Sequence, residues 1–141
     1  MAVKIFLDIN TLVDFFDADR PDHESAAQLV ELSEANDVSA YVSESVLNTV
    51  VYFLRKEYKA ESMRTMLAHL LKFMIILPCT NMTYSRALQL SSTDLEDAVL
   101  YQLAIDGKLD YFITSNKKDF KKISSSMLPV VSAKEILKML Y

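Results

Sequence analysis

The sequence predicts an α/β fold, in which a mainly parallel sheet of about five strands carries helices on both faces. Short apolar runs alternate along the chain with longer segments of helical spacing, and strands joined through helices pair in parallel by crossover connections. Gly107 is the only glycine in 141 residues. A glycine-rich phosphate loop is therefore excluded, and the scarcity of glycine argues against an all-β fold, which needs many glycine turns.

Each expected strand is a short run of apolar, β-branched or aromatic residues. The first run ends at Asp8 and is typical of a strand buried on both faces. The second, VSAYVS, alternates in polarity. The expected strands cover residues 2–7, 38–43, 75–79, 111–115 and 128–132.

The expected helices carry apolar residues three and four positions apart, the spacing of one helical face. Gly107 is expected near the end of the sixth helix, where glycine is common. The expected helices cover residues 11–17, 23–36, 44–58, 60–74, 82–92, 93–109 and 133–140, and a further helical turn begins at 118.

The composition is that of a globular protein, with 51% hydrophobic and 24% charged residues, and the length predicts one domain over residues 1–141. No apolar stretch approaches the ~20 residues that cross a bilayer, and no signal peptide is recognisable. A single cysteine, Cys79, is typical of a reducing compartment, so we expect a cytoplasmic protein without membrane contact. The Cys79 thiol is expected to be buried.

Acidic and amide side chains stand where expected strands end or helices begin. They are Asp8, the pair Asp94 and Asp97, and the pair Asn116 and Asp119. Ligands of parallel sheets bind beyond the carboxyl ends of the strands. Carboxylates that converge there repel one another unless a cation joins them. Oxygen ligands suit Mg²⁺ or Mn²⁺, which can activate water against a phosphodiester.

Helix capping is the alternative explanation for each acid taken alone. Thr93 and Glu96 have the spacing of a capping box, and acids in a first turn complement the helix dipole. The first helix is expected to be capped by Asn10 or Thr11, which leaves Asp8 unexplained by capping.

Other acid-based or nucleophilic sites fit less well. A zinc site lacks ligands, because there is one cysteine and the two histidines lie far apart in the sequence. The GxSxG elbow of a serine hydrolase is absent. A haloacid-dehalogenase-like phosphatase requires DxDxT, but the chain has Asn10 at the second acidic place, and a receiver domain requires an aspartate after the third strand, where IILPC has none.

Three segments, FLDINTLVDFF, DLEDAVLYQLA and DYFITSNKKDF, resemble in this order and spacing the PIN-domain family, and within it the VapC-like toxins of type II toxin–antitoxin pairs. RKEY and PVVSAKEIL are similar to one bacterial subgroup. The resemblance covers the whole chain and implies a three-layer α/β/α sandwich. It also implies a Mg²⁺- or Mn²⁺-dependent endoribonuclease that acts on RNA and is silenced by an antitoxin protein. A catalytically silent PIN-like module that binds RNA or protein is the alternative.

The resemblance also implies roles for individual residues. Asp8 and Asp97 match the first and third acids and are the expected metal ligands, while Asn116 and Asp119 stand at the fourth acidic position and complete the expected catalytic set. The family's second acid has no clear match. The supporting residues are expected to be Asn10, Glu44, Asn48, Asp94, Thr114 and Ser115, with Thr49 as another occupant of the second position.

A basic segment and an apolar surface complete the expectations. The net charge is −4, yet NKKDFKK places Lys117, Lys118, Lys121 and Lys122 within six residues, and we expect them to contact RNA phosphates. A solvated helix face is the alternative. YFLRKEY and SMRTMLAHLLKFM carry aromatic and Met-rich residues that fit an ordinary core, a homodimer interface or an antitoxin surface.

Overall fold

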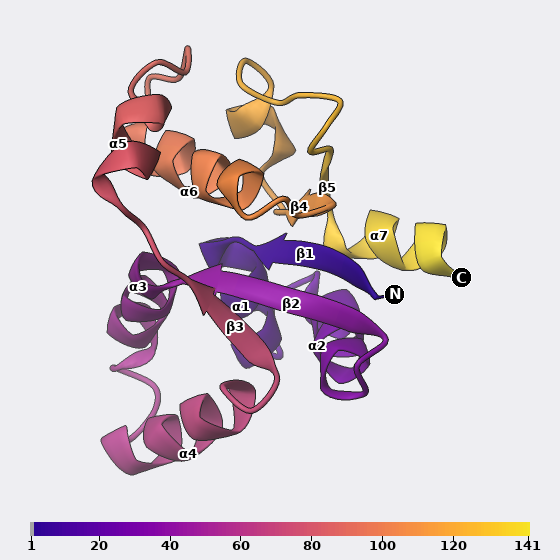
Figure 1. Ribbon diagram of the computed structural model, residues 1–141. Helices are drawn as coiled ribbons and strands as arrows, with labels where there is room; N and C mark the ends of the chain where they lie inside the picture. The colour runs from indigo at the N-terminus through magenta and orange to yellow at the C-terminus, as the bar shows by residue number, and fades with distance from the viewer. Residues whose placement is uncertain (1) are drawn as a thin grey trace.

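The structure is a computed structural model that describes residues 2–141. Within that range one sheet has the strand order β3-β2-β1-β4-β5, and every pair of neighbouring strands is parallel (Figure 1). The prediction of a mainly parallel sheet of about five strands is confirmed. The strands are β1 (Val3–Leu7), β2 (Val38–Ser43), β3 (Met74–Leu77), β4 (Tyr111–Ile113) and β5 (Val130–Val131).

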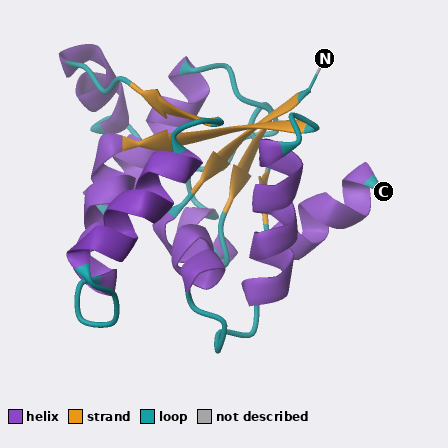
Figure 2. Ribbon diagram, turned by 90° about the horizontal axis from the view of Figure 1, so that it is seen from below, coloured by secondary structure: helices purple, strands orange, loops and turns teal. Residues whose placement is uncertain are grey.

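Helices cover both faces of the sheet, as expected of a three-layer sandwich. They are α1 (Ile9–Phe16), α2 (His23–Glu34), α3 (Glu44–Leu54), α4 (Ala60–Leu70), α5 (Asn81–Ala87), α6 (Leu95–Asp106) and α7 (Ala133–Leu140), with a short 3-10 helix, η1 (Lys117–Phe120). Helices α5 and α6 lie on one face, and α1, α2 and α3 lie on the other (Figures 1 and 2). The chain reverses its direction across the sheet between β3 and β4, so right-handed crossovers place α5 and α6 on the opposite face.

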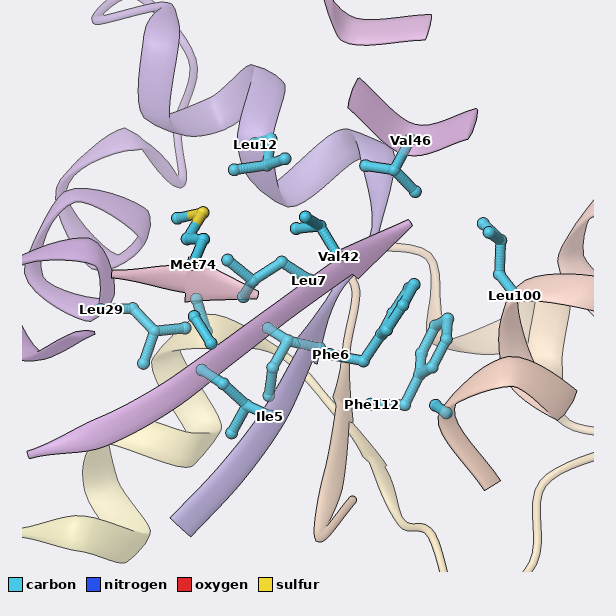
Figure 3. Packing of buried hydrophobic residues seen from close by; sticks show 14 of the residues in the cluster. Ile5, Phe6, Leu7, Leu12, Leu29, Val42, Val46, Met74, Leu100 and Phe112 are labelled. Carbon is cyan, nitrogen blue, oxygen red and sulfur yellow. The ribbon is translucent and has the colours of Figure 1, made fainter. Parts of the chain in front are cut away.

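The middle of the sheet is buried on both faces. Ile5, Phe6 and Leu7 of β1 are at most 1% exposed, as expected of a central parallel strand. The rings of Phe6 and Phe112 stack with centroids 5.2 Å apart and point toward Leu100 of α6 (Figure 3). This packing fixes α6 over the junction of β1 and β4, the junction at which the site residues lie.

Several element boundaries differ from those the sequence predicts. Helix α1 begins at Ile9 rather than residue 11, because Asp8 caps it. The expected helix over 60–74 is wrong beyond Leu70, since Met74 joins the sheet and pairs with Ala40. The strand β2 and the last helix, α7, have the predicted bounds.

The expectation that Cys79 is buried is wrong, because the thiol is exposed. Strand β3 lies at the edge of the sheet and ends at Leu77. Pro78 has no N–H to continue the ladder, so the chain leaves the sheet there and carries Cys79 outward. As for membranes, the helices of residues 2–141 are each too short or too polar to cross a bilayer.

Candidate functional site

The candidate site lies where the strand order reverses. From β1, the chain extends the sheet through β2 in one direction and through β4 in the other. A crevice beyond the carboxyl ends of the strands forms at such a switch point and is the usual ligand site of open α/β sheets. Asp8 and Thr114 are the residues that follow β1 and β4.

Asp8 is buried, with 4% of its surface exposed. Its Oδ1 accepts the Ile9 backbone N–H at 2.8 Å and its Oδ2 accepts the Thr114 hydroxyl at 2.9 Å. The expected cap at Asn10 or Thr11 is therefore wrong: Asp8 itself is the N-cap of α1. The same carboxylate also joins β1 to β4, which capping alone does not require.

Asn10 supports this junction with a neutral amide. Its Nδ2 donates to the Thr114 Oγ1 at 3.2 Å, and its Oδ1 accepts the backbone N–H of Ser115 at 3.0 Å. The Thr114 Oγ1 in turn accepts the backbone N–H of Asn116 at 3.1 Å. Asn10 and Thr114 thus hold the Asp8 carboxylate in one orientation and tie the segment after β4 to the start of α1.

Asp97 lies in the first turn of α6. The helix is capped by Asp94, whose Oδ1 accepts the Asp97 backbone N–H at 3.1 Å. The expected capping box of Thr93 and Glu96 is wrong, because Ser92 fixes the preceding turn through its hydroxyl and shifts the cap to Asp94. Asp94 therefore has the structural role of a cap, while the carboxylate of Asp97 is left to face the site.

Burial and neighbouring negative charges raise the pKa of Asp97 to about 7, with burial the largest cause, followed by Asp94, Asp8, Asp119 and Glu96. Burial also raises the pKa of Asp8, against the hydrogen bonds from Ile9 and Thr114. These carboxylates are close enough to repel one another electrostatically, as the sequence predicts. The site is an arrangement of negative charge that a cation would relieve.

Asp97 opens into a hollow of about 360 Å³, which we call the acidic hollow. It is lined by Ser92, Thr93, Asp94, Asp97, Lys118, Asp119 and Lys122. Asp119, in η1, reaches it as predicted. Asn116 is the N-cap residue of η1, but its side chain makes no capping hydrogen bond. It lies at the edge of the site beside Thr114.

The candidates for the second acidic position face elsewhere. Glu44 and Asn48 line a separate hollow of about 400 Å³ between α3, the end of β3 and α6, which we call the α3–α6 pocket. Thr49 donates its hydroxyl to the Ser45 carbonyl at 2.8 Å, within its own helix. The acidic hollow has no carboxylate from α3 among its lining residues.

The lysine cluster is divided by the fold. Lys118 and Lys122 line the acidic hollow, whereas the Nζ of Lys117 contacts both carboxylate oxygens of Glu135, at 2.9 and 3.0 Å. The Lys117 ammonium also lowers the pKa of Glu135. The spacing of Ser132 and Glu135 predicts a capping box, which is present, but nothing local predicts the contact with Lys117. Lys117, Lys118 and Lys121 line an adjoining hollow together with residues 124–126.

The donor set fits a hydrated, hard cation. Among residues 2–141, no three His, Cys, Asp or Glu side chains stand close enough together to enclose one metal ion. A closed zinc site is therefore not formed, whereas Mg²⁺ is usually held by one or two carboxylates and keeps several waters. Asp8 and Asp97 match that smaller requirement. The metal-binding and catalytic roles of Asp8, Asp97, Asn116 and Asp119 stay predictions.

Comparison with known proteins bears on the family. Residues 4–118 match the family model described as PIN domain. Ribonuclease VapC1 of Aquifex aeolicus (strain VF5) is 30% identical over 122 residues, which cover 83% of this chain and 83% of that protein. The family model covers most of the chain, including Asp8 and Asp97.

Solved structures share the fold at lower identity. The VapBC2 structure from Rickettsia felis, bound to a DNA fragment from its promoter, aligns with a TM-score of 0.66 and 21% identity, over 92% of this chain and 98% of that one. A toxin–antitoxin complex from Klebsiella pneumoniae aligns with a TM-score of 0.65 and 24% identity, over 88% and 94%. The sarcin-ricin loop cleaving toxin VapC20 of Mycobacterium tuberculosis aligns with a TM-score of 0.60 and 16% identity, over 77% and 86%. With its motifs, its sheet and its family match in agreement, the chain belongs to the PIN-domain family.

Proposed function

We propose that the protein is a metal-dependent endoribonuclease that hydrolyses RNA phosphodiester bonds and is the toxin of a toxin–antitoxin pair. The carboxylates around Asp97 carry the proposal: burial first, and then the charges of Asp94, Asp8, Asp119 and Glu96, raise the pKa of Asp97 to about 7, and a cation would relieve that repulsion. The 30% identity to a VapC ribonuclease supports the same activity.

In this proposal Asp8 and Asp97 hold Mg²⁺ or Mn²⁺. Thr114 and Asn10 orient the Asp8 carboxylate through the hydrogen bonds described above. A bound cation would favour the ionised form of Asp97, whose pKa is raised by burial and then by neighbouring negative charges. The cation supplies Lewis-acid chemistry, in that it lowers the pKa of water and neutralises phosphate charge.

Other residues position the RNA. Asp119 lines the acidic hollow, and Asn116 is bonded through its backbone N–H to Thr114, next to Asp8; we propose that both hold water or the cation's hydration shell. Lys118 and Lys122, on the rim of the same hollow, attract the phosphates that a chain of net charge −4 would otherwise repel. Their contacts position the strand without reading its sequence.

We also propose an antitoxin partner and a homodimer. Two of the structural relatives are toxin–antitoxin structures, which supports the first. On α3, Tyr52 and Phe53 are 66% and 60% exposed, which supports an interface there, whereas Met63 and Leu70 of α4 are buried in the core. We further infer that residues 1–141 act as one domain, and that the exposed free thiol of Cys79 suits the reducing cytoplasm.

Cleavage of a structured RNA by the purified protein tests the proposal. Wild type with Mn²⁺ should cut the RNA, and EDTA should stop it. Asp8→Asn should abolish cleavage while the circular dichroism spectrum stays unchanged, because asparagine caps a helix about as well as aspartate. Cleavage that survives both EDTA and Asp8→Asn would contradict the proposal.

A silent PIN-like module is the second candidate, and one observation favours it. The acidic hollow lacks a carboxylate from α3, since Glu44 and Asn48 line the α3–α6 pocket. With fewer charges the site would bind its cation more weakly. In that case the wild-type protein should bind RNA or a protein partner, with or without Mn²⁺, and leave the RNA intact.

A further inference from the structure

The α3–α6 pocket lies at the same edge of the sheet as the acidic hollow but beyond β2 and β3. Leu77 from the end of β3 and Leu100 and Leu103 from α6 form an apolar wall. Glu44, Asn48 and Tyr84 add polar and aromatic groups. A concave site with apolar walls and a few polar groups is the usual form of a small-ligand site.

The two hollows are neighbours along α6. Asp97 lines the acidic hollow, and Leu100, three residues further on, lines the pocket. Residues three apart lie one above the other on a helix, about one turn of ~5.4 Å apart. An RNA strand with a phosphate at Asp97 can therefore place an adjacent nucleotide over the α3–α6 pocket.

The chemistry of the pocket suits a base and not a phosphate. Glu44 is the one charged side chain among the described residues that line it, so a phosphate would be repelled. The lysines line the acidic hollow and its neighbour instead. Tyr84 is 55% exposed and offers a ring on which a base can stack. A flat, neutral, partly apolar group with hydrogen-bonding edges matches these surroundings.

We infer that the α3–α6 pocket binds the nucleobase next to the scissile phosphate and selects guanine, an inference that rests on the proposed function. An ionised carboxylate only accepts hydrogen bonds, so Glu44 favours a base edge with N–H donors. Guanine offers two adjacent donors, its N1–H and its 2-amino group, whereas uracil has no amino group. The exposed amide of Asn48 can donate to the remaining acceptors of the base.

Binding of short RNAs separates this inference from cleavage. The Asp97→Asn protein is titrated with fluorescent oligouridines that contain a single guanine, adenine, cytosine or hypoxanthine, and anisotropy reports the affinity. A single guanine lets the strand slide until that base meets the pocket. We expect guanine to bind about 10-fold more tightly than uracil or hypoxanthine, the scale of one good base contact. Glu44→Gln, added to this protein, should remove most of that preference.

Variants of Tyr84 test the stacking. Tyr84→Ala should weaken binding of all the RNAs on the order of 10-fold, whereas Tyr84→Phe should keep the affinity because the ring remains. Leu88→Ala is the matched control, since Leu88, the C-cap residue of α5, is exposed four residues after Tyr84 but does not line the pocket. Equal affinities of Tyr84→Ala and Leu88→Ala would overturn the inference.

The outcomes for the two proposals differ. Wild-type protein that cleaves RNA, combined with a base preference that Glu44→Gln leaves unchanged, overturns the guanine pocket and leaves the ribonuclease standing. A Glu44-dependent guanine preference, combined with no cleavage in Mn²⁺, supports the pocket and overturns the ribonuclease.

Discussion

The carboxyl ends of β1 and β2 both carry a helix-capping side chain, but the two side chains differ in charge. Asp8, directly after β1, and Ser43, the last residue of β2, each cap a helix: Asp8 accepts the Ile9 N–H at 2.8 Å, and Ser43 accepts the Val46 N–H at 3.0 Å. Ser43 is neutral, and its hydroxyl also forms a hydrogen bond with the nearby Ser45 hydroxyl, at 2.9 Å. The second carboxylate oxygen of Asp8 accepts the hydroxyl of Thr114, which follows the neighbouring strand β4. The capping side chain is thus purely structural at the end of β2, whereas after β1 it is also a candidate metal ligand.

The difference arises from the neighbouring strands. Strand β1 borders β4, at the reversal of strand order, and faces the acidic start of α6. Strand β2 borders β3, whose end is apolar and contributes Leu77 to the α3–α6 pocket. Charged side chains therefore gather at the end of β1, and apolar side chains at the end of β2.

The largest expected effect separates the two caps by activity. Asp8→Asn should lower cleavage by more than about 100-fold, since loss of groups that merely support a metal ligand already costs 10–100-fold. Ser43→Ala should leave cleavage within about twofold but cost ~1 kcal/mol of stability through the lost cap. Cleavage assays with urea denaturation check both variants. Equal losses of activity would mean that the two ends are functionally alike.

Thr114→Val should reduce Mn²⁺ affinity by about 10–100-fold without removing a ligand. The buried Asp8 Oδ2 would lose its hydroxyl donor, at a cost of ~1–3 kcal/mol in unfolding free energy. Isothermal titration with Mn²⁺ measures the affinity. Ser45→Ala, at the start of α3 after β2, is the control and should bind Mn²⁺ as wild type does.

The pH dependence of stability should distinguish the acidic hollow. The pKa of Asp97 is near 3.8 when unfolded and about 7 when folded. The folded state therefore holds the proton more tightly, and the metal-free protein should lose stability as the pH rises from about 4 to about 7. Because the Asp97 carboxyl is partly exposed, we expect a modest effect.

Melting temperatures in EDTA check this. Asp97→Asn should stabilise the protein at pH 8 but hardly at pH 4, and Mn²⁺ should stabilise wild type more than the variant at pH 8. Glu44→Gln, which removes one negative charge from the α3–α6 pocket, is the matched control and should leave the wild-type slope. A lower melting temperature for Asp97→Asn at pH 8 would favour a purely structural role.

The smallest expected effect concerns the lysines. Lys118→Ala and Lys122→Ala should each reduce the slope of log affinity against log salt by ~0.7 for single-stranded RNA. Lys117→Ala should change the slope less, because its ammonium is paired with Glu135. Salt titrations of RNA binding compare the three variants. A larger change for Lys117 would show that RNA displaces the ion pair.

The sequence alone determined the class of fold and the edge of the sheet at which the candidate site is proposed. Period and composition are local signals, so β2 and α7 were predicted at their observed bounds. The parallel sheet then implies that Asp8 and Thr114, which follow separate strands, lie at one edge, and this prediction is confirmed by their hydrogen bond. Asp97 and Asp119 were also expected near Asp8, because residues at helix starts that follow parallel strands lie at the same edge of the sheet. The charges of Asp8 and Asp119 do act on Asp97.

Only the tertiary structure decided how these side chains are used. The pKa of Asp97 depends on burial and on charges from three segments, and Lys117 meets Glu135 across 18 residues. Glu44 and Tyr84 share a pocket because α3 and α5 flank the end of β3. Neighbours that are distant along the chain set each of these properties. A pattern over a few residues can predict strand ends and some helix caps. It does not predict which charged groups and aromatic rings from distant segments will come into contact.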